Sequence, residues 1–236
     1  MKRSLMFPGF TALPSLRLVL LGGALALAPA VAGCGGGLKY TVDDAAMDPI
    51  PASDRAGVFE ARKEQDIATS EQRSADTLLE NLDRDFDVAN KEKEQARLEI
   101  EKAIAEQEGA KASRDENQAN AAAHNKDVAD TNMKVVESKI EWLDQKRDWL
   151  KQNKKAAEAH LEAAKAHVEL EKAKVAQQRG IKPSSDFRVS DFESQWKSKN
   201  SDYESEKQDA ASEEQDAKKK EEHWQAQQAH LQKMKG

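Results

Sequence analysis

Residues 58–179 contain no proline and a single glycine, Gly109, and this long stretch constrains the fold more than any other feature. Proline and glycine end or weaken helices, so their near absence permits helix throughout the stretch. The composition agrees, because 34% of the residues are charged, only 5% are aromatic, and alanine, glutamate, lysine and glutamine dominate the body. The sequence therefore predicts an all-α protein built as a coiled coil.

Apolar residues in this stretch recur every seven positions, the pattern of helices that pack side by side. With Val58 as position a, position d is alanine or leucine in every heptad from Ala61 to Ala110. A second apolar stripe begins near Ala129, roughly 100–140° around the helix from the first. We expect one narrow seam over 58–110. Over 129–175 we expect a face wide enough for two neighbours, or for one neighbour held off-centre.

A turn is predicted at 180–190, because Gly180 suits a left-handed helix cap and Pro183 follows it closely. A returning helix is expected over 191–236. Folding the chain at this turn brings alanines opposite alanines and tryptophans opposite tryptophans. This size matching predicts an antiparallel hairpin of about 130–179 on about 191–235. The expected packing residues are Trp142, Trp149, Trp196, Tyr203 and Trp224.

The segment 109–132 leaves two architectures open. It is rich in asparagine and aspartate, which are weak helix formers. However, position a keeps its phase from Ile100 through Ala121 to Val128. The favoured expectation is one unbroken coiled-coil helix over about 57–179, a rod of about 180 Å at 1.5 Å per residue. The alternative is a three-helix antiparallel bundle with a turn near 110–127.

The amino-terminal 33 residues have the order of a secretory signal. Three basic residues come first, an uncharged apolar run starts at Leu18, and small residues precede Cys34, the only cysteine. The apolar run is shorter than the roughly 20 residues of a spanning helix. Val31, Ala32, Gly33 and Cys34 resemble the lipobox of bacterial lipoproteins. This resemblance implies removal of residues 1–33, a covalent lipid on the Cys34 sulfur and anchoring to a membrane.

The residues after Cys34 bear on tethering and location. Three glycines followed by Pro49 and Pro51 predict a lipidated, flexible tether over 34–57. Gly35 stands where an aspartate favours inner-membrane retention of enteric lipoproteins. The resemblance therefore implies the outer membrane, facing the periplasm, with the inner membrane and surface display left open. Loss of the signal, which carries three basic residues, would change the net charge from −6 to −9.

The sequence offers little for catalysis or for metal and nucleic-acid binding. His160 and His167 are seven residues apart, as are His223 and His230, whereas a helical metal pair is usually four apart. No basic stripe is present to neutralise phosphates. We therefore expect no enzyme activity, no metal, no cofactor other than the covalent lipid on Cys34, and no nucleic-acid partner.

The expected function is a structural spacer or protein-interaction scaffold in the cell envelope. If the hairpin covers only 130–179, the 58–110 seam has no internal partner and predicts a homo-oligomer or a helical protein partner. The alternatives are a periplasmic chaperone-like holder of unfolded envelope proteins and an adaptor hairpin in a secretion or efflux assembly. The body also loosely resembles long helical outer-membrane lipoproteins, in which a C-terminal lysine is joined to peptidoglycan. Here Lys235 is penultimate and Gly236 is last, so this chain departs from that pattern and peptidoglycan attachment is left open. The largest side chains of the expected interface are Leu79, Leu82, Phe86 and Ile100.

Overall fold

The computed structural model describes residues 37–236, and the chain divides into two compact units, Met1–Gly37 and Leu38–Gly236. The predicted signal peptide, Val31, Ala32, Gly33 and Cys34 lie outside the described residues. The second unit begins with two short 3-10 helices, η1 (Asp44–Ala46) and η2 (Ala52–Arg55). Three long helices follow: α1 (Ala56–Ser113), α2 (Glu116–Gln178) and α3 (Val189–Lys235). The described residues contain no strand, which confirms the all-α fold class.

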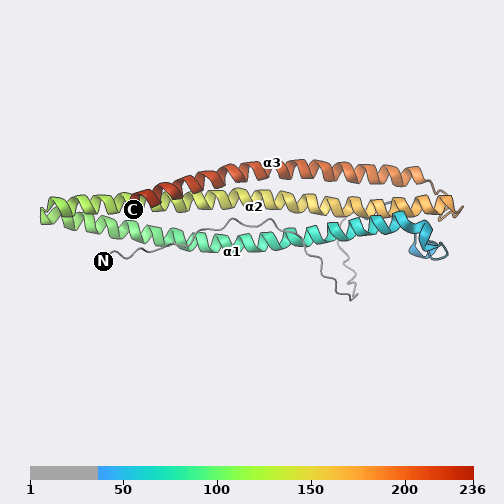
Figure 1. Ribbon diagram of the computed structural model, residues 1–236, viewed down its shortest axis with the longest axis horizontal. Helices are drawn as coiled ribbons and strands as arrows, with labels where there is room; N and C mark the ends of the chain where they lie inside the picture. Colours follow the sequence, from blue (N-terminus) through green and yellow to red (C-terminus); the bar gives the residue numbers. More distant parts are fainter. Residues whose placement is uncertain (1–36) are drawn as a thin grey trace, which may run out of the picture. The chain divides into compact units, whose positions relative to one another are not determined.

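Helix α2 is the central element of this unit and packs against both α1 and α3 (Figure 1). Consecutive helices run antiparallel, because the start of α1 and the start of α3 both lie at the end of α2. Within residues 37–236, α1 and α3 form no extended interface with each other. The wide apolar face expected over 129–175 thus serves two neighbours, and the predicted α2–α3 hairpin is present.

The expectation of one unbroken helix over 57–179 is wrong, because the chain reverses at Arg114 and Asp115. Arg114 has left-handed backbone angles (φ 58°, ψ 18°) and ends α1. Asp115 caps α2, since its side chain accepts hydrogen bonds from the backbone N–H groups of Asn117 (2.9 Å) and Gln118 (3.3 Å). The three-helix alternative, with its turn near 110–127, is the architecture found.

Burial of the alanine seam explains why α1 folds back. All eight position-d residues from Ala61 to Ala110 are buried, as are Val58 and Phe86 of position a. They face a heptad row on α2 that runs from Ala122 to Ala164 and includes Leu143 and Leu150. A left-handed residue other than glycine costs about 1–2 kcal/mol. Covering a seam of ten buried residues is worth several times more.

Ala121 does not belong to the buried row. That residue is exposed, and the buried row restarts at Ala122 instead. The apparent continuity of position a from Ile100 to Val128 was therefore a coincidence. The fold-back also halves the expected length, because the 58 residues of α1 span about 90 Å rather than about 180 Å.

The second reversal follows the predicted signals. Gly180 has a φ of 67°, and the chain there forms two hydrogen bonds typical of a helix C-terminus. The Ile181 N–H donates to the Ala176 carbonyl (2.8 Å), and the Gly180 N–H donates to the Gln177 carbonyl (3.1 Å). Helix α3 then begins at Val189, close to the predicted start, and returns along α2.

Candidate functional site

The predicted flexible tether over 34–57 is wrong from Leu38 onward, because residues 38–55, here called the strap, fold against the helices. The strap lies at the end of the unit where α1 begins, α2 ends and α3 begins, here called the base. Val42, Met47 and Ile50 are buried there, in one cluster with Leu170 of α2 and Phe192 of α3. Burial of these three side chains outweighs the flexibility expected of a segment between glycines and prolines.

Backbone hydrogen bonds fix the start of the strap. The Tyr40 N–H donates to Gln195 Oε1 (2.9 Å), and Gln195 Nε2 donates back to the Tyr40 carbonyl (2.9 Å). The Val42 N–H donates to Glu169 Oε2 (2.6 Å). Two residues of the strap are therefore bound by α2 and α3 side chains, so the chain is ordered almost from the first residue of this unit.

Lys172 of α2 is the buried charged residue at the base, with 5% of its surface exposed. Its ammonium donates to the Val42 carbonyl (3.3 Å) and contacts Glu169 Oε1 (2.7 Å) and Asp44 Oδ1 (2.8 Å). Burial pushes the pKa of Lys172 down, but the hydrogen bonds to Asp44 and Glu169 outweigh it and leave that pKa raised. The hydrogen bond from Lys172 is the main cause of a lowered pKa at Asp44. These charge-assisted hydrogen bonds hold the strap on α2.

Between α1 and α2, polar pairs, here called the polar ladder, lie beside the alanine seam at five of the seven heptad positions from 64 to 106. Glutamates of α1 meet histidine, lysine or asparagine of α2, and every pair has the same antiparallel register. The pairs are Glu64–His167 (2.6 Å), Glu71–His160 (2.6 Å), Glu92–Lys139 (2.6 Å), Glu99–Asn132 (2.8 Å) and Glu106–Asn125 (3.5 Å). His160 and His167, whose spacing did not suit a metal pair, are thus partners of α1 carboxylates.

The predicted hairpin residues meet α2 in aromatic layers. Trp142 and Trp224 stack with centroids 4.9 Å apart and planes 7° apart. Tyr203 stacks on His160 (4.5 Å), and Trp196 lies against His167 (5.4 Å). Trp149 instead lines a hollow beside Tyr203. Because α3 buries few other large side chains, these layers and the hydrogen bonds Gln145–Glu213 and Gln152–Glu206 hold it on α2.

The large side chains that were predicted to contact another protein pack within this chain instead. Leu82 and Phe86 are buried against Leu143 and Leu150 of α2, and Leu79 packs beside them. Ile100 is half-buried, farther along the same seam. The seam has its partner within the chain, so it no longer argues for an oligomer. The prediction assumed an unbroken helix, which would have left these side chains uncovered.

A trough runs over α2 between α1 and α3. One hollow along it, of about 440 Å³, has Leu78 and Ala75 on one wall, Tyr203 and Ala210 on the other, and Trp149 among its lining residues. Leu78 occupies the heptad position that follows the paired Glu71, and this apolar side chain interrupts the polar ladder.

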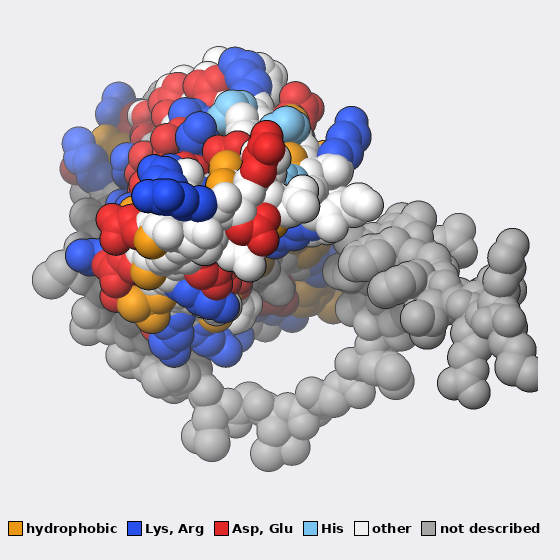
Figure 2. All heavy atoms as spheres, turned by 90° about the vertical axis from the view of Figure 1, so that its left-hand side faces the viewer, with side chains coloured by type: hydrophobic (Ala, Val, Ile, Leu, Met, Phe, Trp, Pro, Cys, Tyr) orange, Lys and Arg blue, Asp and Glu red, His pale blue; other side chains and the backbone are white. Residues whose placement is uncertain are grey.

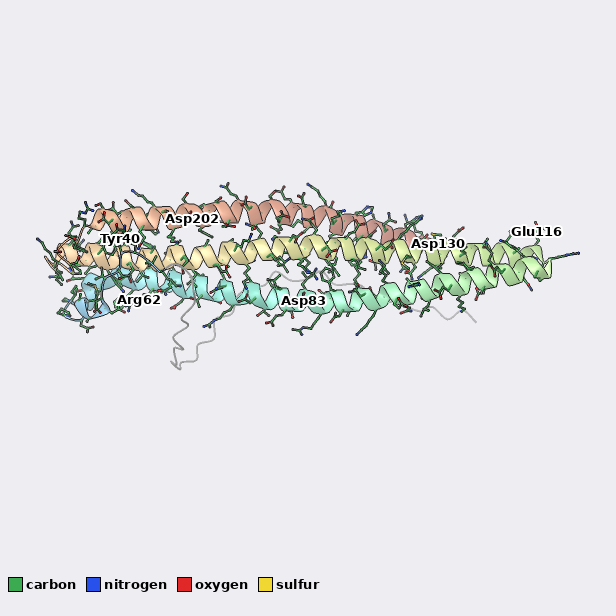
Figure 3. All side chains as sticks on the ribbon, turned by 180° about the vertical axis from the view of Figure 1, so that it is seen from behind. Tyr40, Arg62, Asp83, Glu116, Asp130 and Asp202 are labelled. Atoms are coloured by element: carbon green, nitrogen blue, oxygen red, sulfur yellow. The ribbon has the colours of Figure 1, made fainter. Side chains whose placement is uncertain are left out.

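At the opposite end from the base, α1 and α2 extend beyond α3. Figure 3 shows Asp130 near the end of α3 and Glu116 farther along, at the turn. Residues 100–131, here called the tip, form a two-helix hairpin. Figure 2 views this end and shows acidic and basic side chains interspersed over it. Small residues fill the interface between the two helices of the tip, where Ala103, Ala110 and Ala122 are buried.

Lys172, Glu169 and Asp44 were not predicted as functional residues. The sequence did hold a signal for burial of the strap: it contains the large apolar or aromatic residues Tyr40, Val42, Met47 and Ile50, which are unusual in a solvated tether. The turn at Asp115 also had a signal, because an aspartate followed three residues later by Gln118 matches a helix capping box.

Comparison with protein-family models, with curated proteins and with solved structures gave no match. Within residues 37–236, no helix combines the length and hydropathy needed to cross a membrane. In the same residues, no three acidic, histidine or cysteine side chains converge as metal ligands.

Proposed function

We propose that this chain is a lipid-anchored spacer or scaffold of a bacterial cell envelope. Acylated Cys34 would hold the base at a membrane, and the helices would carry the tip about 90 Å away. The observation that carries the proposal is the strap. The strap begins at Leu38, four residues after the proposed lipid site in the sequence, and is fixed to α2 and α3 by Tyr40 and Val42.

The mechanism is geometric. A flexible tether of more than twenty residues would let the helices point in any direction. In the sequence, only Gly35, Gly36 and Gly37 separate the proposed lipid site from the strap. The three helices then supply length and stiffness, and the tip is the surface offered to an envelope partner, either a helical protein or a second copy.

An adaptor in a secretion or efflux assembly is the second candidate function, favoured by the projection of the α1–α2 hairpin beyond α3. A chaperone-like holder has less support. The exposed large apolar side chains are single residues of α1, from Phe59 to Ile104, spread over several heptad positions. Scattered apolar residues of this kind are ordinary on protein surfaces.

Anchoring is tested by expressing the full chain with a clickable palmitate analogue, together with Cys34→Ser as the matched control. We expect label and membrane association for the native chain, and neither for Cys34→Ser. Label that persists in Cys34→Ser would refute the anchor.

Spacing is tested by deleting one heptad from each helix of the tip, residues 99–105 and 126–132, which keeps the register of the polar ladder. The reach falls by about 10 Å. If the chain is a spacer or adaptor, the shortened form should no longer crosslink to its partner through a photo-reactive residue placed at Asn117. Deletion of 99–105 alone is the control for misfolding, because it breaks the register between α1 and α2. Comparing the two deletions separates loss of crosslinking through misfolding from loss through shortening. Capture by the shortened form at the native level would contradict the proposal.

A further inference from the structure

We infer that the tip, residues 100–131, opens as a local unit while the rest of Leu38–Gly236 stays folded. The tip is the part of α1 and α2 that extends beyond α3 (Figure 3). Helix α3 ends at Lys235, which lines a small hollow together with Asn132, so it does not cover the tip. The inference goes beyond the proposed function, and its test needs neither the anchor nor a partner.

The first argument is the size of the buried side chains. The buried residues of the tip are all alanines: Ala103, Ala110, Ala122 and Ala129. Residues 79–96 of α1 and 136–150 of α2, here called the middle, bury much larger side chains: Leu82, Phe86, Leu143 and Leu150. A buried methyl group contributes far less to stability than a buried leucine or phenylalanine side chain. Closing the tip is therefore worth less per residue than closing the middle.

The second argument is that polar contacts between α1 and α2 weaken toward the turn. In the middle, Lys139 donates a charge-assisted hydrogen bond of 2.6 Å to Glu92, whereas in the tip the neutral Asn125 meets Glu106 at 3.5 Å. Within the described residues, the ion pairs of the tip each join two residues of one helix: Arg97–Glu101, Lys102–Glu106 and Lys126–Asp130. A hollow of about 250 Å³ is also lined by both helices here. Contacts between alanines therefore supply most of what holds the tip closed.

The third argument is that neither helix of the tip is stable without the other. The tip holds 14 residues of α1, 100–113, and 16 residues of α2, 116–131. Isolated helices of this length are marginal in water, and asparagine and aspartate in 109–132 weaken them further. The left-handed Arg114 adds to the cost of the closed turn. Once the two helices separate, both lose their helical structure, so the tip opens as one unit.

Opening gives the tip two states with different surfaces. The open state uncovers the alanine faces that the closed hairpin hides. A helical partner that packs on those faces binds the open state, and its apparent affinity is reduced in proportion to the open fraction. Binding at the tip is thereby coupled to the stability of the tip.

Hydrogen exchange of the full chain, followed by mass spectrometry, tests the inference. Peptides within 101–113 and 117–130 report on the tip, and peptides within 80–95 and 137–150 report on the middle. After correction for intrinsic exchange, we expect protection about 100-fold lower in the tip than in the middle, and nearly uniform across both helices of the tip. Asp115→Ala should lower protection by about fivefold in both helices of the tip, because the Asp115 cap stabilises the closed state.

Phe86→Leu is the matched variant outside the tip. It should lower protection in the middle by about threefold or more, because Phe86 packs against α2 there. Protection in the tip should stay unchanged, because Phe86 remains packed when only the tip opens. Equal protection in tip and middle, falling together in Phe86→Leu, would show that the helices open only as a whole and would overturn the inference. Protection that falls only in the last turn beside Arg114 would show fraying of helix ends, which also overturns it.

Discussion

Lys172 shows how one residue decides the state of a whole segment. Its ammonium lies under the strap, bonded to the Val42 carbonyl, Glu169 and Asp44, and its side chain is 7% exposed. A buried ammonium is tolerated only when its hydrogen bonds are made, so the strap and Lys172 require each other.

Replacing Lys172 with methionine should therefore lower the free energy of unfolding by about 3 kcal/mol, because Glu169 and the Val42 carbonyl lose their partner. Urea denaturation followed by circular dichroism measures this. Lys174→Met is the matched control, since Lys174 is 42% exposed and pairs only with Glu171 in the same helix. It should cost less than about 0.5 kcal/mol. Equal effects of the two substitutions would show that the network contributes nothing.

The pKa shifts of this network predict how strap docking responds to pH. The Asp44 pKa is lowered from 3.8, mainly by the Lys172 hydrogen bond, so its contribution is present above 3.8 and is lost as pH falls through the lower folded value. The Lys172 pKa is raised from 10.5, so its contribution is present below 10.5 and is lost as pH rises through the folded value. Protection of the Tyr40 and Val42 amides from hydrogen exchange should be flat between these limits and fall outside them, after correction for intrinsic exchange. A steady decline across neutral pH would contradict this assignment.

At the scale of the elements, the end of α1 and the start of α2 depend on one residue each. Arg114 adopts left-handed angles that suit glycine, and Asp115 supplies the cap of α2. Arg114→Gly should raise the free energy of unfolding by about 0.5–1 kcal/mol through relief of strain. Asp115→Ala should lower it by about 1 kcal/mol through loss of the cap. Thermal denaturation of both variants checks the signs, and a destabilised Arg114→Gly would argue against the turn.

The α1–α2 interface predicts a second contrast. Phe86→Ala should cost about 3 kcal/mol, since Phe86 is buried against α2. The loss should not depend on protein concentration, because the contact lies within one chain. Leu98→Ala is the control, as Leu98 is 56% exposed on the same helix and should change stability little. A sedimentation coefficient that falls in Phe86→Ala would restore the earlier idea of an intermolecular seam.

For the whole unit, the register of the polar ladder makes the fold-back testable. In a Cys34→Ser background, Glu99→Cys with Asn132→Cys should be joined within one chain by a short thiol-to-thiol crosslinker, because the native side chains at these two positions meet, with Asn132 Nδ2 2.8 Å from Glu99 Oε2. Glu99→Cys with Asn125→Cys, one heptad out of register, should not. Gel mobility under non-reducing conditions separates the crosslinked monomer from a dimer. An unbroken rod would give crosslinked dimers or no crosslink with either pair.

Several features could be predicted from the sequence because they depend on local pattern. Helix content follows from the missing prolines and the heptad repeat, and the α2–α3 turn follows from Gly180 and Pro183. The packing of Trp142 on Trp224 followed from matching large residues across that turn. Each of these depends on residues near in sequence or on one simple pairing.

The break at Arg114, the docked strap and the partner of the α1 seam were decided only by tertiary structure. Asp115 matches a helix-capping pattern, but Arg114 carries no helix-stop signal, and a left-handed arginine is accepted only because reversal covers the seam from Ala61 to Ala110. Val42, Met47 and Ile50 are too few to order a segment alone, and they find a pocket only where three helix ends meet. The sequence by itself determined which stretches are helical and which faces are apolar. Which faces meet depends on the total apolar area that residues far apart in the sequence bury together, and this total cannot be read from a local pattern.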